Sequence, residues 1–240
     1  MTRLLRPLRF HWRVAVGEFL VVLCGVLLAL AVDDWAAERA DRAQEAGSLA
    51  RLADDLELDI RMLEGFGEMA ENALEAVAGV RVALAAPGGV EEPLAFLQQL
   101  VAATNLGWTM PLGERATFDE LLATGGLALV SDPVLRADIT RYYRVGEEQR
   151  NRTLARRSEL PALVYRLVPR DSEYRVDDAL SAEEAARLVE ELRALGGEQH
   201  LTSQGNFLRF VKGSFEMRRE QAEKLLGSVL ERRAGLASAD

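Results

Sequence analysis

A nearly uninterrupted apolar stretch, Val14 to Val32, dominates the start of this sequence. Its 19 residues contain a single acid, Glu18. As an α-helix the stretch would be roughly 28 Å long, close to the ~30 Å hydrocarbon core of a membrane. Trp12 and Trp35 flank it, and indole rings favour the membrane interface. The stretch therefore predicts a transmembrane helix close to the start of the chain.

Charge is distributed unequally on the two sides of this stretch. Four arginines lie within residues 1–13, whereas Asp33 and Asp34 follow the stretch directly. The positive-inside rule places an arginine-rich flank in the cytoplasm. The sequence therefore predicts a short cytoplasmic tail over residues 1–13, a signal anchor over residues 14–32 and an extracytoplasmic domain over residues 33–240.

A cleaved signal peptide is the alternative to an uncleaved anchor. The arginine-rich start, the apolar run and Ala29-Leu30-Ala31 resemble its three regions, with cleavage after Ala31. Against this, the apolar run is long for a signal peptide, and helix-forming sequence continues through Asp33. An uncleaved anchor is the preferred interpretation.

Glu18 is the one charged residue inside the predicted span. At 100° per residue, Gly25 and Ala29 lie about 20° to either side of Glu18, and Val21 and Val22 share this face. Two small residues four positions apart allow helices to approach closely. The face predicts a contact with another copy or a different membrane protein, with Glu18 bonded across it. The alternative is an acid that reaches cytoplasmic water from the end of the span while the helix contacts only lipid.

Composition restricts the function of the remaining chain. The chain has 29 basic and 38 acidic residues, of which residues 33–240 hold 25 and 37, a net charge of −12. An acidic body of this size argues against nucleic-acid binding, which requires a basic surface. One cysteine, Cys24, and two histidines, His11 and His200, provide none of the usual zinc spacings. We therefore expect no metal and no other cofactor.

Residues 36–86 contain no proline and repeat apolar residues at intervals of three and four, which predicts a long helix with one packed side. A bend is expected near Gly65 and Gly67. Further helices are expected over residues 91–104, 117–124, 133–160, 181–196 and 203–233. Strand-like alternation is not sustained anywhere in the sequence. The predicted class is all-α, with one membrane helix that continues into an elongated helical bundle.

Short motifs mark several helix starts. Candidate capping boxes begin at Thr117 and Ser181, and Ser131 or Asp132 is the expected cap before Pro133.

Two segments resemble a group of uncharacterised bacterial single-pass membrane proteins. The first is VGEFLVVLCGVLLALAVDDWAAER, with a Gly-Glu at the head of the span and a tryptophan after it. The second is ATFDELLATGGLALVSDPVLRADITRYYR, residues 116–144. This chain departs from the group in having Asp33-Asp34, where amides are more common. The resemblance implies an uncleaved span in a bacterial inner membrane and a domain on its far, periplasmic side, and it implies no activity.

Catalytic motifs are weak in this sequence. Thr124-Gly125-Gly126 lacks the ending of a phosphate loop and is better explained as a helix stop. The acid pairs Asp54-Asp55 and Glu183-Glu184 are adjacent on predicted helices, so they are expected to point apart into solvent. His200 has no predicted nucleophile beside it. No catalytic residue is therefore proposed, and an enzyme is the least favoured class.

Arg115, Phe118, Tyr142 and Tyr143 fall in the second resembling segment. The three rings are expected to pack as ordinary core, and the alternative is a pocket lined by the tyrosines. Arg115 is expected to pair with a nearby acid, the alternative being an anionic ligand. A filled junction would favour a membrane-anchored scaffold or interaction protein. A cavity there would favour a sensor of small ligands that signals through a partner.

Overall fold

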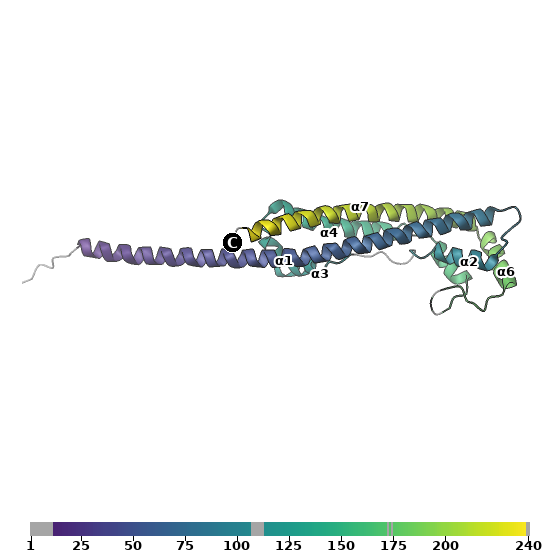
Figure 1. Ribbon diagram of the computed structural model, residues 1–240, viewed down its shortest axis with the longest axis horizontal. Helices are drawn as coiled ribbons and strands as arrows, with labels where there is room; N and C mark the ends of the chain where they lie inside the picture. The colour runs from purple at the N-terminus through teal and green to yellow at the C-terminus, as the bar shows by residue number, and fades with distance from the viewer. Residues whose placement is uncertain (1–11, 107–112, 172, 174, 239–240) are drawn as a thin grey trace, which may run out of the picture.

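The computed structural model describes residues 12–106, 113–171, 173 and 175–238, and the chain is helical along most of this length (Figure 1). Its helices are α1 (Trp12–Ala85), α2 (Pro93–Ala102), α3 (Ala116–Thr124), α4 (Pro133–Leu154), α5 (Leu160–Leu167), α6 (Ala182–Ala194) and α7 (Gly197–Ala237), with a 3-10 turn, η1 (Gly126–Leu129). The described residues form no strand, only an isolated bridge between Arg170 and Val176. The predicted all-α class, headed by a long apolar helix, is confirmed.

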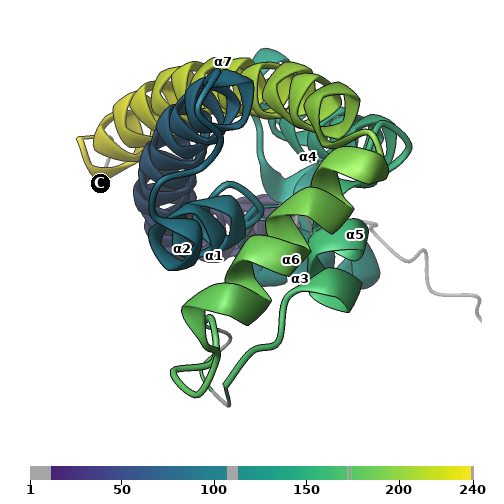
Figure 2. The ribbon, with the colours of Figure 1, turned by 90° about the vertical axis from the view of Figure 1, so that its right-hand side faces the viewer.

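The long helices α1 and α7 form the axis of the molecule. They run antiparallel, and α7 ends part-way along α1, so residues 16–41 of α1 project alone from the bundle (Figure 1). The shorter α4 packs against α7, while α2, α5 and α6 gather at the end of the rod farthest from the N-terminus (Figure 2). With 74 residues, α1 is about 110 Å long.

Buried apolar side chains form three clusters in succession along the rod. The first joins α1, α4 and α7 where the bundle begins, the second lies between the middle parts of α1 and α7, and the third fills the far end. Representative members are Leu49, Ile139 and Val229 in the first, Ala73, Leu208 and Phe215 in the second, and Leu97, Val164 and Leu192 in the third. Helix α1 contributes to all three, so it is the element on which the others assemble.

Helix α1 passes through Gly65 and Gly67 without a break, and the bend expected there stays a prediction. Neither glycine is crowded, because an added Cβ would meet no atom within 4 Å. Buried residues continue on either side, at Leu63 and Ala70. Packing against α7 therefore outweighs the cost of placing glycine in a helix, which is about 1 kcal/mol per residue relative to alanine.

Two predicted helix caps are confirmed. The carboxylate of Asp132 accepts a hydrogen bond from the backbone N–H of Val134 at 2.8 Å and so begins α4. Ser181 and Glu184 form a reciprocal capping box, in which the N–H of Ser181 donates to Glu184 at 3.0 Å and the N–H of Glu184 donates to Ser181 at 3.3 Å. Both helix starts are fixed by hydrogen bonds between residues two or three positions apart, so the sequence alone predicts them.

The predicted cap of α3 is wrong. The helix begins at Ala116, and Thr117 does not cap it; instead the backbone N–H of Thr117 donates to a carboxylate oxygen of Asp55 at 3.0 Å. A carboxylate on α1 therefore satisfies this helix start from outside. The predicted solvent exposure of the Asp54-Asp55 pair is wrong for Asp55, which is half-buried, and correct for Asp54.

Two further boundaries differ from the prediction. Helix α4 ends at Leu154, before the expected residue 160, and a new helix begins at Leu160 with Pro161 in its first turn, in agreement with the expectation that Pro161 bends or restarts the helix. Helix α7 begins at Gly197, well before the expected residue 203. Gly196 takes a left-handed conformation, φ +79°, and reverses the chain directly after α6.

Candidate functional site

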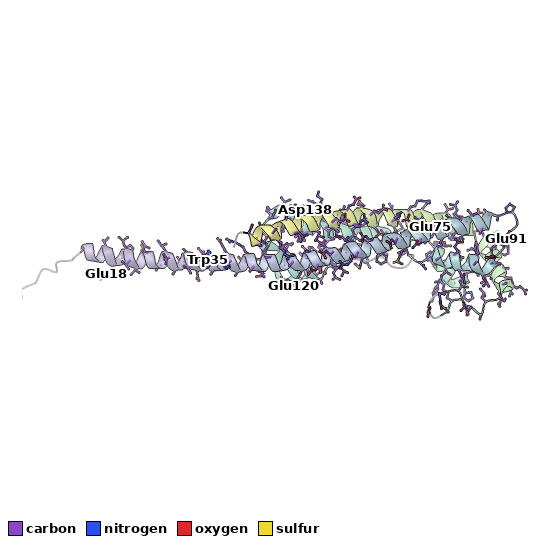
Figure 3. The ribbon with its side chains drawn as sticks, viewed as in Figure 1. Glu18, Trp35, Glu75, Glu91, Glu120 and Asp138 are labelled. Carbon is purple, nitrogen blue, oxygen red and sulfur yellow. The ribbon has the colours of Figure 1, made fainter. Side chains whose placement is uncertain are left out.

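The predicted membrane-contact face lies on the part of α1 that projects from the bundle (Figure 3). Glu18, Val21, Val22, Gly25 and Ala29 are all exposed, as is every residue of α1 from position 16 to position 41. This part of α1 is the one segment of the described residues that is long and apolar enough to cross a membrane. The helix–helix contact remains a prediction, because it concerns a second chain. The tail over residues 1–13 lies almost wholly outside the described residues.

The candidate pocket residues form a filled junction. Phe118, Tyr142 and Tyr143 are buried, with Phe118 stacked on Tyr143 at 4.2 Å and the two tyrosines in edge contact at 5.1 Å between ring centroids. Of the three, Tyr142 also borders a surface cavity of about 180 Å³ between α4 and α7. Arg115 lies at the rim and binds Asp119 at 3.0 Å and Glu147 at 3.8 Å, so its pairing with acids agrees with the expectation.

A carboxylate that the sequence analysis did not single out lies at the centre of this junction. Asp59 of α1 is completely buried. One carboxylate oxygen accepts a hydrogen bond from the hydroxyl of Tyr142 at 2.7 Å, and the other accepts from the backbone N–H of Glu114 at 2.6 Å. The guanidinium of Arg218, itself buried, lies 3.6 Å from the same carboxylate. Asp59 thus joins α1 to α4, to α7 and to the segment before α3.

Two glycines make room for this cluster. A Cβ at Gly113, where φ is +82°, would lie 2.5 Å from the carboxylate of Asp59. A Cβ at Gly146 of α4 would lie 2.2 Å from the guanidinium of Arg218. A larger residue at either position would therefore require the carboxylate of Asp59 or the guanidinium of Arg218 to move.

Burial and charge act against each other in this cluster. Burial raises the pKa of Asp59, and the hydrogen bonds from Tyr142 and Glu114 together with the charge of Arg218 oppose this rise. Burial also raises the pKa of the Tyr142 hydroxyl, which therefore stays protonated and donates to Asp59. The guanidinium of Arg218 lies 5.1 Å from the centroid of the Tyr142 ring, a cation–π contact that adds a second link between α7 and α4.

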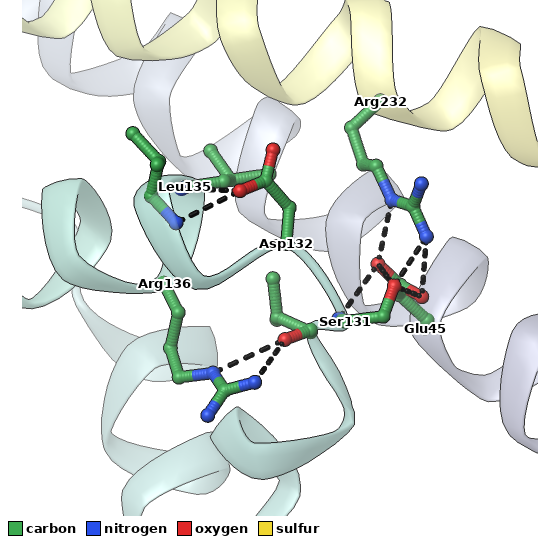
Figure 4. Close-up of polar contacts among 8 residues, drawn as sticks. Glu45, Ser131, Asp132, Leu135, Arg136 and Arg232 are labelled. Carbon is green, nitrogen blue, oxygen red and sulfur yellow. Dashed lines mark hydrogen bonds and ion pairs between the residues drawn. The ribbon is translucent and has the colours of Figure 1, made fainter.

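A second buried carboxylate lies where the bundle begins (Figure 4). Glu45 of α1 is 3% exposed and accepts hydrogen bonds from the N–H and the hydroxyl of Ser131, each at 3.2 Å to the same oxygen. Arg232 of α7 donates to its two oxygens at 2.9 and 3.2 Å and also contacts the Ser131 hydroxyl. Arg136 holds the same turn through the carbonyl of Val130, at 2.8 Å.

The surroundings of Glu45 stabilise its charged form. Burial alone would raise its pKa, but hydrogen bonds from Arg232 and Ser131 outweigh burial, so the pKa of Glu45 is lowered. Glu45, Asp55 and Asp59 thus share one role. Each is an acid on α1 that accepts hydrogen bonds from the chain between residues 113 and 131, which is distant in sequence.

This arrangement holds segments of the chain together. Its acids are engaged by backbone N–H, hydroxyl and guanidinium donors, and no group of three or more His, Cys, Asp or Glu in the described residues is placed to hold a metal ion. His200, half-buried in the first turn of α7, donates its backbone N–H to Gly196 at 3.3 Å.

The positions of Asp59 and Glu45 carried a signal in the sequence. Asp59 follows Leu56 by three residues and precedes Leu63 by four, and Glu45 precedes Leu49 by four, the same intervals that separate buried residues of α1. An acid whose spacing matches that of the buried residues of a helix is expected to be buried as well and to need a buried partner. The identity of that partner depends on the fold, so Arg218 and Arg232, more than 150 residues away, could not be found in this way.

Comparisons with protein-family models, with curated proteins and with solved structures find no match to this chain. The resemblance to bacterial single-pass membrane proteins therefore stays a prediction. It alone supports a bacterial setting, whereas the proposed span, orientation and scaffold role rest on the chain's own residues.

The adjacent tyrosines allow a matched test of the Asp59 junction. We expect Tyr142→Phe to lower the free energy of unfolding by about 1–3 kcal/mol, because it removes a donor from a buried carboxylate. Tyr143→Phe should not lower it, because the Tyr143 hydroxyl is buried with no hydrogen-bond partner among the described residues and its removal leaves no other group unpaired. Denaturant unfolding followed by circular dichroism measures both; equal losses would contradict this account of the junction.

The two buried carboxylates should respond to pH in opposite directions. Because folding lowers the pKa of Glu45, this side chain stabilises the folded chain at pH values above its ordinary pKa of 4.5. The stabilisation is lost as the pH falls through the lowered pKa. Because folding raises the pKa of Asp59, the contribution of this side chain to the free energy of unfolding is fully present below its ordinary pKa of 3.8. The contribution is lost as the pH rises through the raised pKa.

We therefore expect the stability difference between the unmodified chain and Glu45→Gln to shrink in acid. The corresponding difference for Asp59→Asn should shrink as the pH rises through the raised pKa. Unfolding curves at a series of pH values measure both differences. If both differences changed with pH in the same direction, the opposite pKa shifts given to Glu45 and Asp59 would be contradicted.

Proposed function

We propose that this chain is a single-pass membrane protein that acts as a scaffold, holding a rigid helical bundle outside the cytoplasmic membrane of a bacterium. The observation that carries the proposal is the continuity of α1. One unbroken helix supplies an exposed apolar segment over residues 16–32 and then the core of the bundle from Glu45 onward. An apolar segment of this length without protein contacts is costly in water and stable in lipid.

The proposed orientation has the N-terminus in the cytoplasm and residues 33–240 in the periplasm. The four arginines within residues 1–13 support it through the positive-inside rule. Trp35 supports it as well, because it is exposed and would lie at the outer interface of the bilayer. Lipid is therefore the first partner of α1.

A scaffold is favoured over a sensor by the tyrosine junction. The rings of Phe118, Tyr142 and Tyr143 are in contact, and the space between α1, α4 and α7 is filled by the first core cluster. The surface cavity between α4 and α7 is bordered by Tyr142 alone of the three rings, and its volume of about 180 Å³ is below the roughly 300–1,000 Å³ of typical ligand pockets. The acidic body, with a net charge of −12 over residues 33–240, supports protein partners over nucleic acid.

We further propose that the span associates with a second copy through the face of Glu18, Val21, Val22, Gly25 and Ala29. A carboxylate this far inside a membrane helix needs a partner or a route to water, and the small residues on the same face allow close approach. Two copies would place a pair of parallel bundles on one membrane.

Cysteine crosslinking in native membranes tests this contact. In a Cys24→Ser background, Ala29→Cys should form disulfide-linked dimers under mild oxidation because position 29 lies on the proposed face. Leu27→Cys is the matched control, since position 27 points to the opposite side, about 180° from Glu18. Adding Glu18→Leu should reduce the crosslinking of Ala29→Cys. Equal crosslinking at positions 27 and 29, or none at either, would contradict the contact.

A further inference from the structure

The turn after α5, at the far end of the rod, contains an arginine, Arg170, that forms no ion pair within the described part of the chain. The Nε and Nη2 atoms of Arg170 are buried and have no hydrogen-bond partner among the described residues. Burial lowers the pKa of this arginine, which indicates that its charge is poorly compensated. Its contact is with the ring of Tyr165, 5.5 Å from the guanidinium carbon to the ring centroid.

The acids that neighbour Arg170 along this turn already accept other hydrogen bonds or ion pairs, including Asp177, which accepts from the backbone N–H of Ala179 at 2.9 Å. Asp171 accepts hydrogen bonds from the backbone N–H groups of Glu173 and Arg175, each at 2.9 Å, and from the Arg175 side chain at 3.1 Å. Glu173 forms an ion pair with Arg175 at 3.1 Å. These bonds stabilise the turn around Arg175, and they leave neither acid directed at Arg170.

Arg170 lines a surface cavity of about 330 Å³, a volume that suits a small molecule. Tyr165 and Arg166 line it too, and Arg166, in the last turn of α5, forms no ion pair within the described residues. Two arginines thus line one cavity, with Nε and Nη2 of Arg170 covered by protein atoms, and the acid that also lines it, Asp171, is bonded elsewhere. The local charge is positive on a chain whose net charge is −9.

We propose that this cavity binds a small organic or inorganic anion, whose carboxylate or phosphate group Arg170 holds through Nε–H and Nη2–H. These two donors form the edge of guanidinium that pairs with two oxygens of one anionic group. They are covered by protein atoms, so the side chain has to swing on its flexible stem toward the cavity that it lines. The proposal goes beyond the scaffold function and does not depend on it.

The position of the cavity decides whether a bound phosphate group could come from a lipid headgroup or from a soluble anion. Val168 and Val176, which flank the turn, pack in the same cluster as Val80 and Leu84 of α1. Residue 80 is about 70 Å along the helix from the end of the span at Val32. Lipid headgroups of the membrane that anchors the chain are therefore out of reach, and a soluble anion is the expected ligand.

Thermal unfolding of the full-length protein in nanodiscs tests the site. Inorganic phosphate and succinate are titrated separately, with sodium chloride at equal ionic strength as the reference. A bound anion raises the unfolding midpoint in proportion to the logarithm of its concentration above Kd. We expect one or both anions to raise the unfolding midpoint beyond the chloride reference with this logarithmic dependence, and the stronger of the two identifies the phosphate or carboxylate class.

Variants then assign the effect to Arg170. Arg170→Gln should weaken the anion about tenfold or more, and Arg170→Lys should also weaken it, because lysine keeps the charge but loses the paired donors. Arg81→Gln, an exposed arginine near the same end of α1, should behave as the unmodified chain. Circular dichroism confirms that each variant is folded. An anion effect equal to that of chloride, or unchanged in Arg170→Gln, would overturn the proposal.

Discussion

The bonds from Asp59 to Tyr142, Glu114 and Arg218 are the interaction on which the arrangement of the bundle depends. A carboxylate removed from water is expensive unless every oxygen finds a donor, and removing one partner of a buried charge pair typically costs about 3–5 kcal/mol. The donors to Asp59 come from three parts of the chain that are distant in sequence. The observed placement of α1, α4, α7 and the segment at residue 114 brings them together on one carboxylate. Hydrophobic packing alone would tolerate a shift of one helix along another, and the buried carboxylate does not.

The same logic repeats along α1. Glu45 and Asp55 accept bonds from the turn before α4 and from the start of α3, so three acids fix the chain between residues 113 and 131 against one helix. The same stretch also contributes Phe118 and Val130 to the first core cluster, so polar bonds and apolar packing both hold it against α1. Because α1 also carries the apolar segment that is proposed to cross the membrane, the bundle is joined to the span without a flexible linker. A force or rotation applied to the span would reach Asp59 through continuous helix.

The sequence was sufficient where the cause of the structure is local. Apolar periodicity predicted α1, and the residues around Asp132 and Ser181 predicted the starts of α4 and α6. It failed where a tertiary contact replaces a local one, as at Thr117, whose N–H is satisfied by Asp55 instead of by its own cap. The candidate site was predicted only in part. The aromatic rings of the junction were named, whereas the acid that organises them was hidden within a helix with many other acids.

The coupling between Asp59 and Arg218 tests this account most directly. A double-mutant cycle compares the unfolding free energies of the unmodified chain, Asp59→Asn, Arg218→Met and the double variant. If the buried pair fixes α7 against α1, the two substitutions should be non-additive by about 1–3 kcal/mol, the double variant losing less than the sum of the single losses. Additivity within about 0.5 kcal/mol would contradict the claim that this carboxylate organises the bundle.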